Sequence, residues 1–388
     1  MKRVVFFLFS LFFFCFSVYA EEFDITGEYV SLYNMNEDML LYSKNDTKKT
    51  SIASLTKMMT TLVAIENIDD LEKVVIIKES DFDGTVGYSK AGFAVGDKVT
   101  YLDLLYGIIL PSGADAVNAI VNNTLGYNSF IKKMNETAKK IGMNDTSFAN
   151  PIGKDDENNY STSSDIAKLL KYALKNETFK KVFTTKSYKT SNGINLESTV
   201  NSYKSILNTG KILGAKSGFT KNAGRCLASI TTLNGVDYLL VVINSSTSSP
   251  SNAVKDTITI YDYYSSNYGY KNILNDDKFI KEIPVDLSKE KTYKITGNED
   301  VNKYLKNSDE VTYEYVGSDK ITFNTKKGSK LGVVNIYNGD ELIATSNVYL
   351  EKNIEYYPIV TYVLIFIGVI FILLIIRKSK KKHRRRRR

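Results

Sequence analysis

The feature that most constrains this chain is an uncharged stretch near its C-terminal end. Residues 358–376 are 19 consecutive residues without Asp, Glu, Lys or Arg, and a membrane-spanning helix needs about 20. The following residues, 377–388, include ten basic side chains. Because Lys and Arg accumulate on the cytoplasmic side of membrane helices, we predict a transmembrane helix at 357–376 and a basic cytoplasmic tail at 377–388. The alternative, a buried core helix, is disfavoured because no soluble sequence follows to surround it.

The first 20 residues predict export of the chain. Lys2 and Arg3 precede an apolar run that ends at Ala20, the pattern of a secretory signal peptide with a small residue at the cleavage site. We predict cleavage after Ala20; an uncleaved anchor is the alternative. Together with the C-terminal helix, this predicts a single-pass protein of the cell membrane whose body lies outside the cell.

The net charge of +8 reflects membrane topology rather than a nucleic-acid partner. Of the 51 basic residues, ten lie in the tail and two in the leader, and the remaining 39 are outnumbered by 43 acidic residues. The exported body therefore has no basic excess to attract phosphate, and we predict no nucleic-acid partner.

The scarcity of histidine and cysteine restricts the chemistry. The single histidine, His383, lies in the tail, which excludes Ser-His-Asp and Cys-His catalysis and a histidine-based metal site. A serine enzyme would need Lys, Glu, Asp or a bound water as its base, and we predict neither a metal nor a cofactor. Cys15 lies in the leader and Cys226 in the body, so the mature chain has no internal disulfide and Cys226 is predicted to be a small core residue.

Residues 21–274 are predicted to form an α+β domain. Strand patterns occur at both ends of this range and helical patterns between them, and Asn234-Gly235 between two apolar runs is a strong hairpin signal. We therefore predict an antiparallel sheet closed by both ends of the segment and covered by helices. The predicted strands lie within 26–44 and at 212–220, 225–232 and 237–243, and the predicted helices at 56–66, 102–110, after 113, and at 130–141, 166–174 and 252–268.

A small all-β domain is predicted at residues 275–352. Its pattern is one of short alternating strands separated by glycine-containing turns, and no chemistry is evident in it. The predicted strands are 311–315, 321–325, 333–337 and 343–350.

A serine and a lysine lie three residues apart at the start of the first predicted helix. Ser54 and Lys57 would occupy one helical face, one turn apart. A serine at a helix N-terminus lies beside free backbone N–H groups and the positive end of the dipole, and a neutral lysine can accept its hydroxyl proton. Alone this is weak evidence, because a capping serine followed by a solvated lysine is common.

Two further segments strengthen this interpretation. Ser112 lies in a Pro-Ser-Gly turn between two predicted helices, and Lys216-Ser217-Gly218 lies on a strand predicted to edge the sheet. Each is ordinary by itself. In this order and spacing, the three segments match the set S-x-x-K, S-x-N and K-T-G of penicillin-binding proteins and β-lactamases.

The sequence resembles the low-molecular-mass penicillin-binding proteins that are D-alanyl-D-alanine carboxypeptidases. The resemblance covers roughly residues 25–376 and combines several motifs. It implies a β-lactamase/transpeptidase-like α+β domain, a small β domain and a C-terminal membrane anchor. The matching blocks are 53–60, 91–116, 148–153, 155–156, 160–162, 214–220, 223–224 and 226–227.

The resemblance implies a serine-type carboxypeptidase that removes the terminal D-alanine from peptidoglycan stem peptides, thereby limits cross-linking, and binds β-lactam antibiotics. Ser54 would be the nucleophile and Lys57 its base, kept neutral by desolvation and by a positive charge on Lys216. Ser112 would relay the proton to the leaving group. The backbone N–H groups of Ser54 and Phe219 would form the oxyanion hole. Lys216, Ser217 and Thr220 would bind the substrate carboxylate, and the substrate-binding strand comprises Lys216, Ser217, Gly218, Phe219 and Thr220.

Three positions depart from the family pattern. Ala114 replaces the usual asparagine, Ser217 replaces threonine but keeps the hydroxyl, and Ile152 stands where a histidine often lies. The family also places a basic residue on the substrate carboxylate. Lys255 and Arg225 are the candidates for it here.

Two rival functions stay open. A β-lactamase shares the fold and motifs but requires a deacylating glutamate, and none lies in a recognisable context. A catalytically weak wall-binding or scaffold protein is the other rival, because Ala114 cannot make the hydrogen bonds of asparagine. A water or Asn118 is a candidate to fill the resulting gap. Release of D-alanine from a D-Ala-D-Ala peptide separates these functions.

Overall fold

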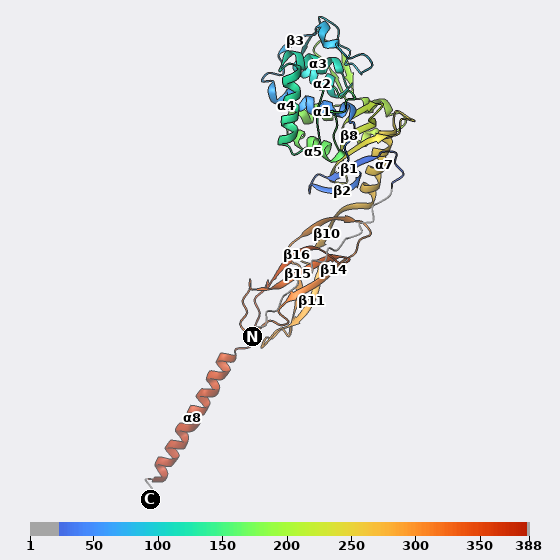
Figure 1. The fold of residues 1–388 in the computed structure, drawn as a ribbon. Coiled ribbons are helices and arrows are strands. Elements are labelled where there is room, and N and C mark those ends of the chain that lie inside the picture. Colours follow the sequence, from blue (N-terminus) through green and yellow to red (C-terminus); the bar gives the residue numbers. More distant parts are fainter. Residues whose placement is uncertain (1–22, 386–388) are drawn as a thin grey trace, which may run out of the picture. The chain divides into compact units, whose positions relative to one another are not determined.

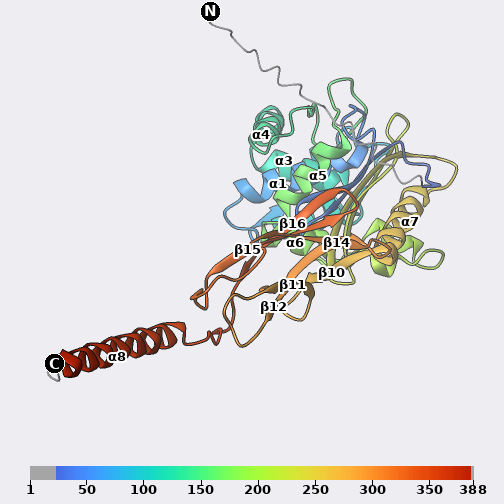
Figure 2. The same cartoon turned by 90° about the horizontal axis from the view of Figure 1, so that it is seen from below.

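The computed structural model describes residues 23–385 (Figures 1 and 2). The chain divides into two compact units, one ending at Ser266 and the other beginning at Asn267. The predicted signal peptide, residues 1–20, lies outside the described residues.

A five-stranded sheet forms the centre of the first unit (Figure 1). Its order is β2-β1-β9-β8-β7, with antiparallel neighbours throughout, so strands from both ends of the segment meet as predicted. β7 lies at the edge, and Lys216 is opposite Ala228 of β8. The strands are β1 (Tyr29–Asn34), β2 (Met39–Lys44), β7 (Gly214–Thr220), β8 (Gly224–Leu233) and β9 (Val236–Ser245).

The turn between β8 and β9 has the conformation that its sequence predicts. Asn234 and Gly235 have φ angles of 52° and 78°, as a two-residue type I′ hairpin requires. This turn sets the register in which the two longest strands of the sheet pair.

Helices cover both faces of the sheet. α5 (Ser163–Ala173) lies on one face, where the Ser163 and Ser31 hydroxyl oxygens are 2.8 Å apart. α7 (Asn252–Asn267) lies on the other, where the Tyr261 and Ser229 hydroxyl oxygens are 2.9 Å apart. Ser31 is level with Ala228 across β9, and successive side chains of a strand alternate in direction. The sheet is therefore the middle of three layers.

The helices between the early and late strands build the main apolar core. α1 (Thr56–Asn67) is buried over its first nine residues, so it forms the centre of this layer. The predicted helices are confirmed with end shifts of a few residues, and α6, which follows the capping residue Asn176, was not predicted. The remaining elements are η1 (Ala53–Leu55), β3 (Val74–Ile76), η2 (Glu79–Phe82), β4 (Lys98–Thr100), α2 (Tyr101–Ile109), α3 (Ala114–Asn123), α4 (Tyr127–Lys140), α6 (Glu177–Thr184), β5 (Ser187–Lys189), β6 (Asn195–Glu197), η3 (Thr199–Tyr203) and η4 (Thr209–Lys211).

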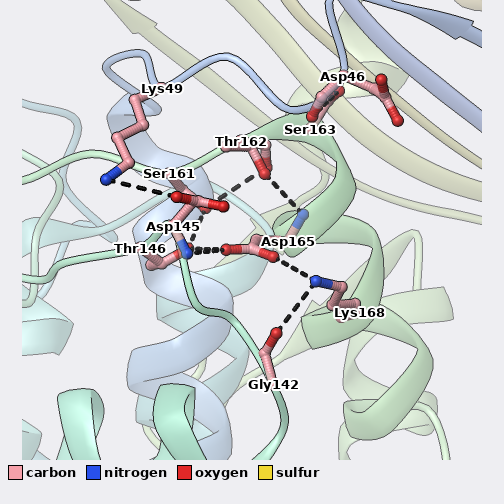
Figure 3. Close-up of polar contacts among 10 residues, drawn as sticks. All are labelled: Asp46, Lys49, Gly142, Asp145, Thr146, Ser161, Thr162, Ser163, Asp165 and Lys168. Carbon is pink, nitrogen blue, oxygen red and sulfur yellow. Dashed lines mark hydrogen bonds and ion pairs between the residues drawn. The ribbon is translucent and has the colours of Figure 1, made fainter.

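A buried carboxylate organises the start of α5 (Figure 3). Thr162 caps the helix, its hydroxyl accepting from the Asp165 backbone nitrogen at 3.0 Å. The Asp165 carboxylate in turn accepts from the Asp145 nitrogen at 2.9 Å and the Thr146 hydroxyl at 2.8 Å, and pairs with Lys168 at 2.7 Å. This network ties the loop after α4 to the helix.

The same network fixes the segment that leads to the first motif. Ser161, the residue before the Thr162 cap, bonds Thr50 in both directions, with N–O distances of 2.8 and 3.0 Å. Because Thr50 lies four residues before Ser54, this bridge anchors the chain immediately upstream of the motif.

The second unit is built of β-strands, as predicted, and ends in the C-terminal helix. Its core contains Ile295, Val334, Ile336 and Leu350. The unit begins with a strand that lies ahead of the predicted boundary at residue 275 and pairs with β13. The strands are β10 (Tyr268–Leu274), β11 (Phe279–Pro284), β12 (Thr292–Thr296), β13 (Val301–Lys306), β14 (Val311–Gly317), β15 (Lys330–Asn338) and β16 (Glu341–Tyr349).

One predicted strand of this unit is wrong. In the segment 321–325, Ile321 makes only an isolated bridge to Val285, and the chain then turns, with the Thr325 nitrogen bonded to the Thr322 carbonyl at 3.2 Å. Asn324 has a φ of 68°, a left-handed conformation that asparagine tolerates and strands do not use.

The C-terminal helix α8 (Ile359–Arg385) contains the predicted apolar stretch. Its segment Thr361–Ser379 spans 19 residues with a mean hydropathy of 2.3 and none of that window is buried. By length and composition this helix is able to cross a membrane.

Candidate active site

Ser54 lies in a single 3₁₀ turn, η1, immediately before α1. The prediction placed it at the helix N-terminus, and the difference is that Leu55 occupies the N-cap position. The preceding Ala53 has a φ of 46°, a left-handed conformation that is uncommon for alanine and typical of functional turns. The turn therefore presents Ser54 outside the regular helix.

Two glycines let other segments approach this turn closely. A side chain at Gly218 of β7 would come within 3.0 Å of the Ser54 nitrogen, and one at Gly153 would collide with the Ala53 carbonyl. Only glycine permits such backbone approach without displacement. Gly218, predicted as a site residue, thus has a definite role, which is to let the edge strand lie against Ser54.

Lys57 is in contact with Ser54. Its Nζ lies 3.0 Å from the Ser54 Oγ and donates to the Ile152 carbonyl at 2.8 Å, and the side chain is 1% exposed. Ile152, which stands in the place of a histidine, therefore contributes its backbone carbonyl. A neutral amine in this position can donate to that carbonyl and accept the serine proton.

The environment favours the neutral form of Lys57. Burial lowers its pKa to about 7, although the nearby Asp115 carboxylate acts in the opposite direction. Lys216 is fully buried as well, and its pKa is lowered first by burial and then by the charge of Lys57. Because like charges repel, the state in which both lysines are protonated is disfavoured.

Asp115 also holds the segment that faces the second motif. Its buried carboxylate accepts from the Ala91 nitrogen at 2.7 Å and from the Gly92 nitrogen at 3.3 Å. The Ala114 nitrogen donates to the Ser89 carbonyl at 2.8 Å. Asp115 therefore has a structural and an electrostatic part in the site, neither of which was predicted.

Ser112 lies at the turn between α2 and α3 and is strained. Its φ is 66°, although it is not a glycine, and its side chain is only 5% exposed. Left-handed non-glycine residues persist where the surroundings over-determine them, and they cluster at functional sites. The strain supports a functional reading of the Pro-Ser-Gly turn.

Ala114, at the start of α3, is completely buried. The possibility that Asn118 fills the gap left by the missing asparagine is excluded. The Asn118 amide donates instead to the backbone carbonyls of Asp81 and Asp83, at 3.1 and 3.0 Å. Four residues along a helix amount to one turn and about 6 Å, which takes this amide to the neighbouring η2 segment.

Thr199 connects the second and third motifs and was not predicted. Its hydroxyl oxygen is 2.6 Å from the Ser217 hydroxyl oxygen, and its nitrogen donates at 3.1 Å to the carbonyl of Leu110, two residues before Ser112. No local sequence signal marks Thr199, because its partners lie 18 and 89 residues away.

Thr220 makes a hydrogen bond that the sequence did not predict. Its hydroxyl donates to the Asp155 carboxylate at 2.6 Å, which places a negative charge beside a residue predicted to bind a carboxylate. The end of β7 near Thr220 is therefore a poor carboxylate site, and Lys216 with Ser217 at the other end is a better one.

The two candidate basic residues lie in different places. The Arg225 guanidinium of β8 lies 3.9 Å from the centre of the Phe219 ring, and its Nε is buried without a hydrogen-bond partner among the described residues. Lys255 lies on α7, which covers the opposite face of the sheet from α5. Arg225 is thus the candidate that contacts the predicted oxyanion-hole residue Phe219.

A three-layer α+β unit with a half-buried serine in contact with a buried lysine beside an edge strand defines a class of protein, the serine acyltransferases that use lysine as base. The family described as D-alanyl-D-alanine carboxypeptidase matches residues 17–247, and the family described as Penicillin-binding protein 5, C-terminal domain, matches residues 268–356. The chain belongs to the D-alanyl-D-alanine carboxypeptidase family, and the predicted family, fold class and enzyme class are confirmed.

Individual relatives agree with this placement. D-alanyl-D-alanine carboxypeptidase DacF of Bacillus subtilis is 28% identical over 330 residues, which cover 83% of this chain and 84% of the relative. The D-alanyl-D-alanine carboxypeptidase of Streptomyces sp. K15 is 34% identical over 228 residues, 54% of this chain and 78% of the relative. The solved structure of the Streptomyces K15 DD-transpeptidase matches with a TM-score of 0.58 and 31% identity, covering 62% of this chain and 98% of that one. Penicillin-binding protein 5 of Haemophilus influenzae shares the fold, with a TM-score of 0.61 at 23% identity over 86% of this chain and 99% of that one.

Proposed function

We propose that the chain removes the terminal D-alanine from peptidoglycan stem peptides through an acyl-enzyme on Ser54. The observation that carries the proposal is that the Nζ of buried Lys57 lies 3.0 Å from the Oγ of half-buried Ser54, with a lysine pKa lowered to about 7. Such a lysine is neutral in a large fraction of molecules at neutral pH and is a competent base. Membership of the carboxypeptidase family supports the same reaction.

The proposed reaction has two steps. Neutral Lys57 accepts the Ser54 hydroxyl proton while the Oγ attacks the carbonyl carbon of the penultimate D-alanine. The backbone N–H groups of Ser54 and Phe219 stabilise the oxyanion, and the proton passes through Ser112 to the departing D-alanine nitrogen. Water then attacks the ester, Lys57 accepts a proton from it, and Ser54 leaves with a proton. β-Lactam antibiotics would acylate the same serine.

Lys216 and Ser217 are the proposed sites for the terminal carboxylate of the substrate. Lys216 donates to the Ser217 carbonyl at 2.7 Å, and the Ser217 hydroxyl is held by Thr199. Thr199 is therefore proposed as a positioning residue. Arg225 is proposed to add positive charge beside Phe219, and Lys255 is not proposed for this role.

The proposal is tested by following D-alanine release from a D-alanyl-D-alanine peptide together with penicillin hydrolysis. We expect D-alanine release and slow loss of the penicillin adduct. Rapid penicillin turnover would favour the β-lactamase function, and acylation by penicillin without any D-alanine release would favour the scaffold function. Alanine at position 114 lacks the side-chain amide of the usual asparagine, and losing that hydrogen bond costs roughly 1–3 kcal/mol if its partner stays unsatisfied. Ala114→Asn is therefore expected to raise the rate of D-alanine release about tenfold.

The acidity of Lys57 predicts the pH dependence of acylation. Because the base form is needed, kcat/KM should rise with pH to a plateau above about 7, the pKa to which burial lowers Lys57. Asp115 raises that pKa, so Asp115→Asn should move the rise to lower pH, by roughly one unit. Asp103→Asn, also buried and hydrogen-bonded to backbone, is the matched control and should leave the midpoint in place. A rise that moves to higher pH in Asp115→Asn would contradict this electrostatic account.

We infer that the catalytic unit is anchored by α8 with its body outside the cell. The apolar segment Thr361–Ser379 and the basic residues after it support this topology. The proposed domains are a signal peptide at 1–20, a catalytic domain that ends at Ser266, a β domain that begins at Asn267 rather than at the predicted residue 275, a membrane helix at 357–376 and a tail at 377–388.

Protease protection tests the topology. Protease added to intact protoplasts should remove the body and spare an epitope placed after Arg388. The same epitope in permeabilised cells is the control and should be lost. Loss of the epitope from intact protoplasts would reverse the proposed orientation.

A further inference from the structure

The second unit is joined to α8 by a short segment that is bonded to the loop at 286–290. The backbone nitrogen of Tyr357 donates to the Leu287 carbonyl at 2.8 Å. Only Pro358 separates Tyr357 from the first residue of α8. The loop at 286–290 therefore lies beside the start of the helix.

A second loop, at 321–327, is held against the same segment. The Tyr356 hydroxyl donates to the carbonyls of Thr322 and Thr325, at 3.2 and 3.1 Å. The Tyr356 ring also contacts the Phe323 ring edge to face, with 5.3 Å between the ring centres. We call the two segments 286–290 and 321–327 the tip loops.

The tip loops and the residue before Pro358 expose apolar side chains. Leu287, Phe323 and Tyr357 are each at least 41% exposed. Single exposed apolar residues are ordinary on a protein surface, but these three occur together at the start of an apolar helix. Leu287 also has a φ of 55°, which is a genuine outlier for a bulky residue, and such strain is concentrated at functional positions.

The chain is too short to hold the tip loops away from a bilayer that α8 crosses. The apolar segment begins at Thr361, four residues after Tyr357, and those residues, partly helical, span about 10 Å. The headgroup layer outside the hydrocarbon core is itself about 5–8 Å thick. Because Leu287 is bonded to Tyr357, it lies within reach of that layer, where tyrosine is also enriched.

The tip loops carry a positive charge. Both of their acidic side chains are in ion pairs with lysines, and the loop residue Lys289 is paired with a glutamate, at N–O distances from 2.5 to 2.9 Å. These pairs are Asp286–Lys320, Glu290–Lys352 and Lys289–Glu355. Lys326 and Lys327 are exposed and make no ion pair within residues 23–385. Lysines at a membrane surface are attracted to acidic lipids.

We propose that the tip loops dock on the bilayer, with Leu287 and Phe323 in the headgroup layer and Lys326 and Lys327 against acidic headgroups. The proposal rests on the proposed anchoring by α8 and adds a second, peripheral contact between the second unit and the lipid. Two loops and one helix together would limit the tilting of this unit on the membrane, which the helix alone would permit.

Tryptophan fluorescence tests the docking in the full-length protein. The chain has no tryptophan, so Leu287→Trp and Phe323→Trp each report on one exposed position. Each protein is reconstituted into vesicles of phosphatidylcholine and phosphatidylglycerol that carry bromine either near the headgroups or near the acyl-chain ends. We expect loss of fluorescence with bromine near the headgroups and a smaller loss with bromine near the chain ends. Val369→Trp, in the middle of the apolar segment, should show the reverse order.

Leu342→Trp is the matched control for the two tip-loop variants. Leu342 and Leu287 are both 52% exposed, but Leu342 lies eight residues before Leu350, roughly 25 Å along the strand. Leu350 is at the tip-loop end, where its carbonyl accepts from the Gly328 nitrogen at 2.7 Å. Leu342→Trp should keep its fluorescence in both kinds of vesicle.

The outcomes separate docking from anchoring. If Val369→Trp is quenched while both tip-loop variants behave as Leu342→Trp, the docking proposal is overturned and the anchoring stands. If Val369→Trp is not quenched, the anchoring is refuted and the docking proposal with it.

The charge contribution is measured in the Phe323→Trp protein. A lysine near an acidic surface favours the docked state roughly fivefold, so Lys326→Gln combined with Lys327→Gln should weaken the quenching. Vesicles of phosphatidylcholine alone should weaken it in the same way. Quenching that is unchanged in both cases would overturn the assignment of acidic headgroups to these lysines.

Discussion

Ser54→Ala is expected to abolish acylation by penicillin and to reduce D-alanine release about 10⁶-fold, because removal of the nucleophile from a serine hydrolase has an effect of that order. The loss follows from geometry: Ser54 is the hydroxyl in contact with the low-pKa amine of Lys57, at 3.0 Å. A fluorescent penicillin measures the acylation, and mass spectrometry of the digested adduct identifies the modified residue.

Ser129→Ala is the matched control for this prediction. Ser129 is an exposed serine on α4, and its removal should change neither labelling nor release. Labelling that persists in Ser54→Ala, or an adduct on Ser112, would show that the nucleophile has been assigned to the wrong serine.

Lys57→Arg is expected to lower the acylation rate by about 10²–10⁴-fold, the range that a general base contributes. The substitution keeps a cationic side chain but removes the base, because a guanidinium does not lose its proton in a protein. The function of Lys57 depends on burial, which lowers its pKa to about 7, and arginine cannot respond to burial in this way. Stopped-flow measurement of penicillin acylation gives the rate.

Folding must be checked for this variant, because Lys57 is 1% exposed and arginine is larger. Thermal unfolding of Lys57→Arg and of the smaller Lys57→Met shows whether loss of activity accompanies loss of structure. Lys132→Arg, at an exposed position of α4, should behave as the native protein. A folded Lys57→Arg protein with near-native acylation would mean that the base lies elsewhere.

Much of the fold follows from local sequence patterns. Asn234-Gly235 predicts its hairpin because few residues adopt two successive left-handed conformations. An apolar stripe predicts the helix at 166–174, and the structure begins that helix at Ser163, after the capping residue Thr162. The predicted strand at 321–325 is wrong because Asn324, like Asn234 in the hairpin, adopts a left-handed conformation. It turns the chain where the apolar spacing predicts an extended segment.

Local sequence patterns predict less of the active site than of the fold. Ser54, Lys57, Ser112 and Lys216 are predicted as site residues because three short motifs occur in order. Thr199 was missed, and so was the contact of Asp155 with Thr220, although these two residues hold Ser217 and Thr220. A hydroxyl or carboxylate becomes a positioning group through a partner far along the chain, and no spacing rule records that partner.

The sequence by itself determined the motifs, the main strands and helices of the first unit, the apolar C-terminal segment and the absence of a histidine base from the body. These depend on residue type and on neighbours within a few positions. The tertiary structure alone decided that Lys57 is buried against the Ile152 carbonyl and that the Asp115 carboxylate opposes the lowering of the Lys57 pKa. It also decided that the Asn118 amide donates to η2 and does not fill the gap at Ala114. Those properties depend on desolvation and on contacts between residues distant in the chain, which only the folded packing brings together.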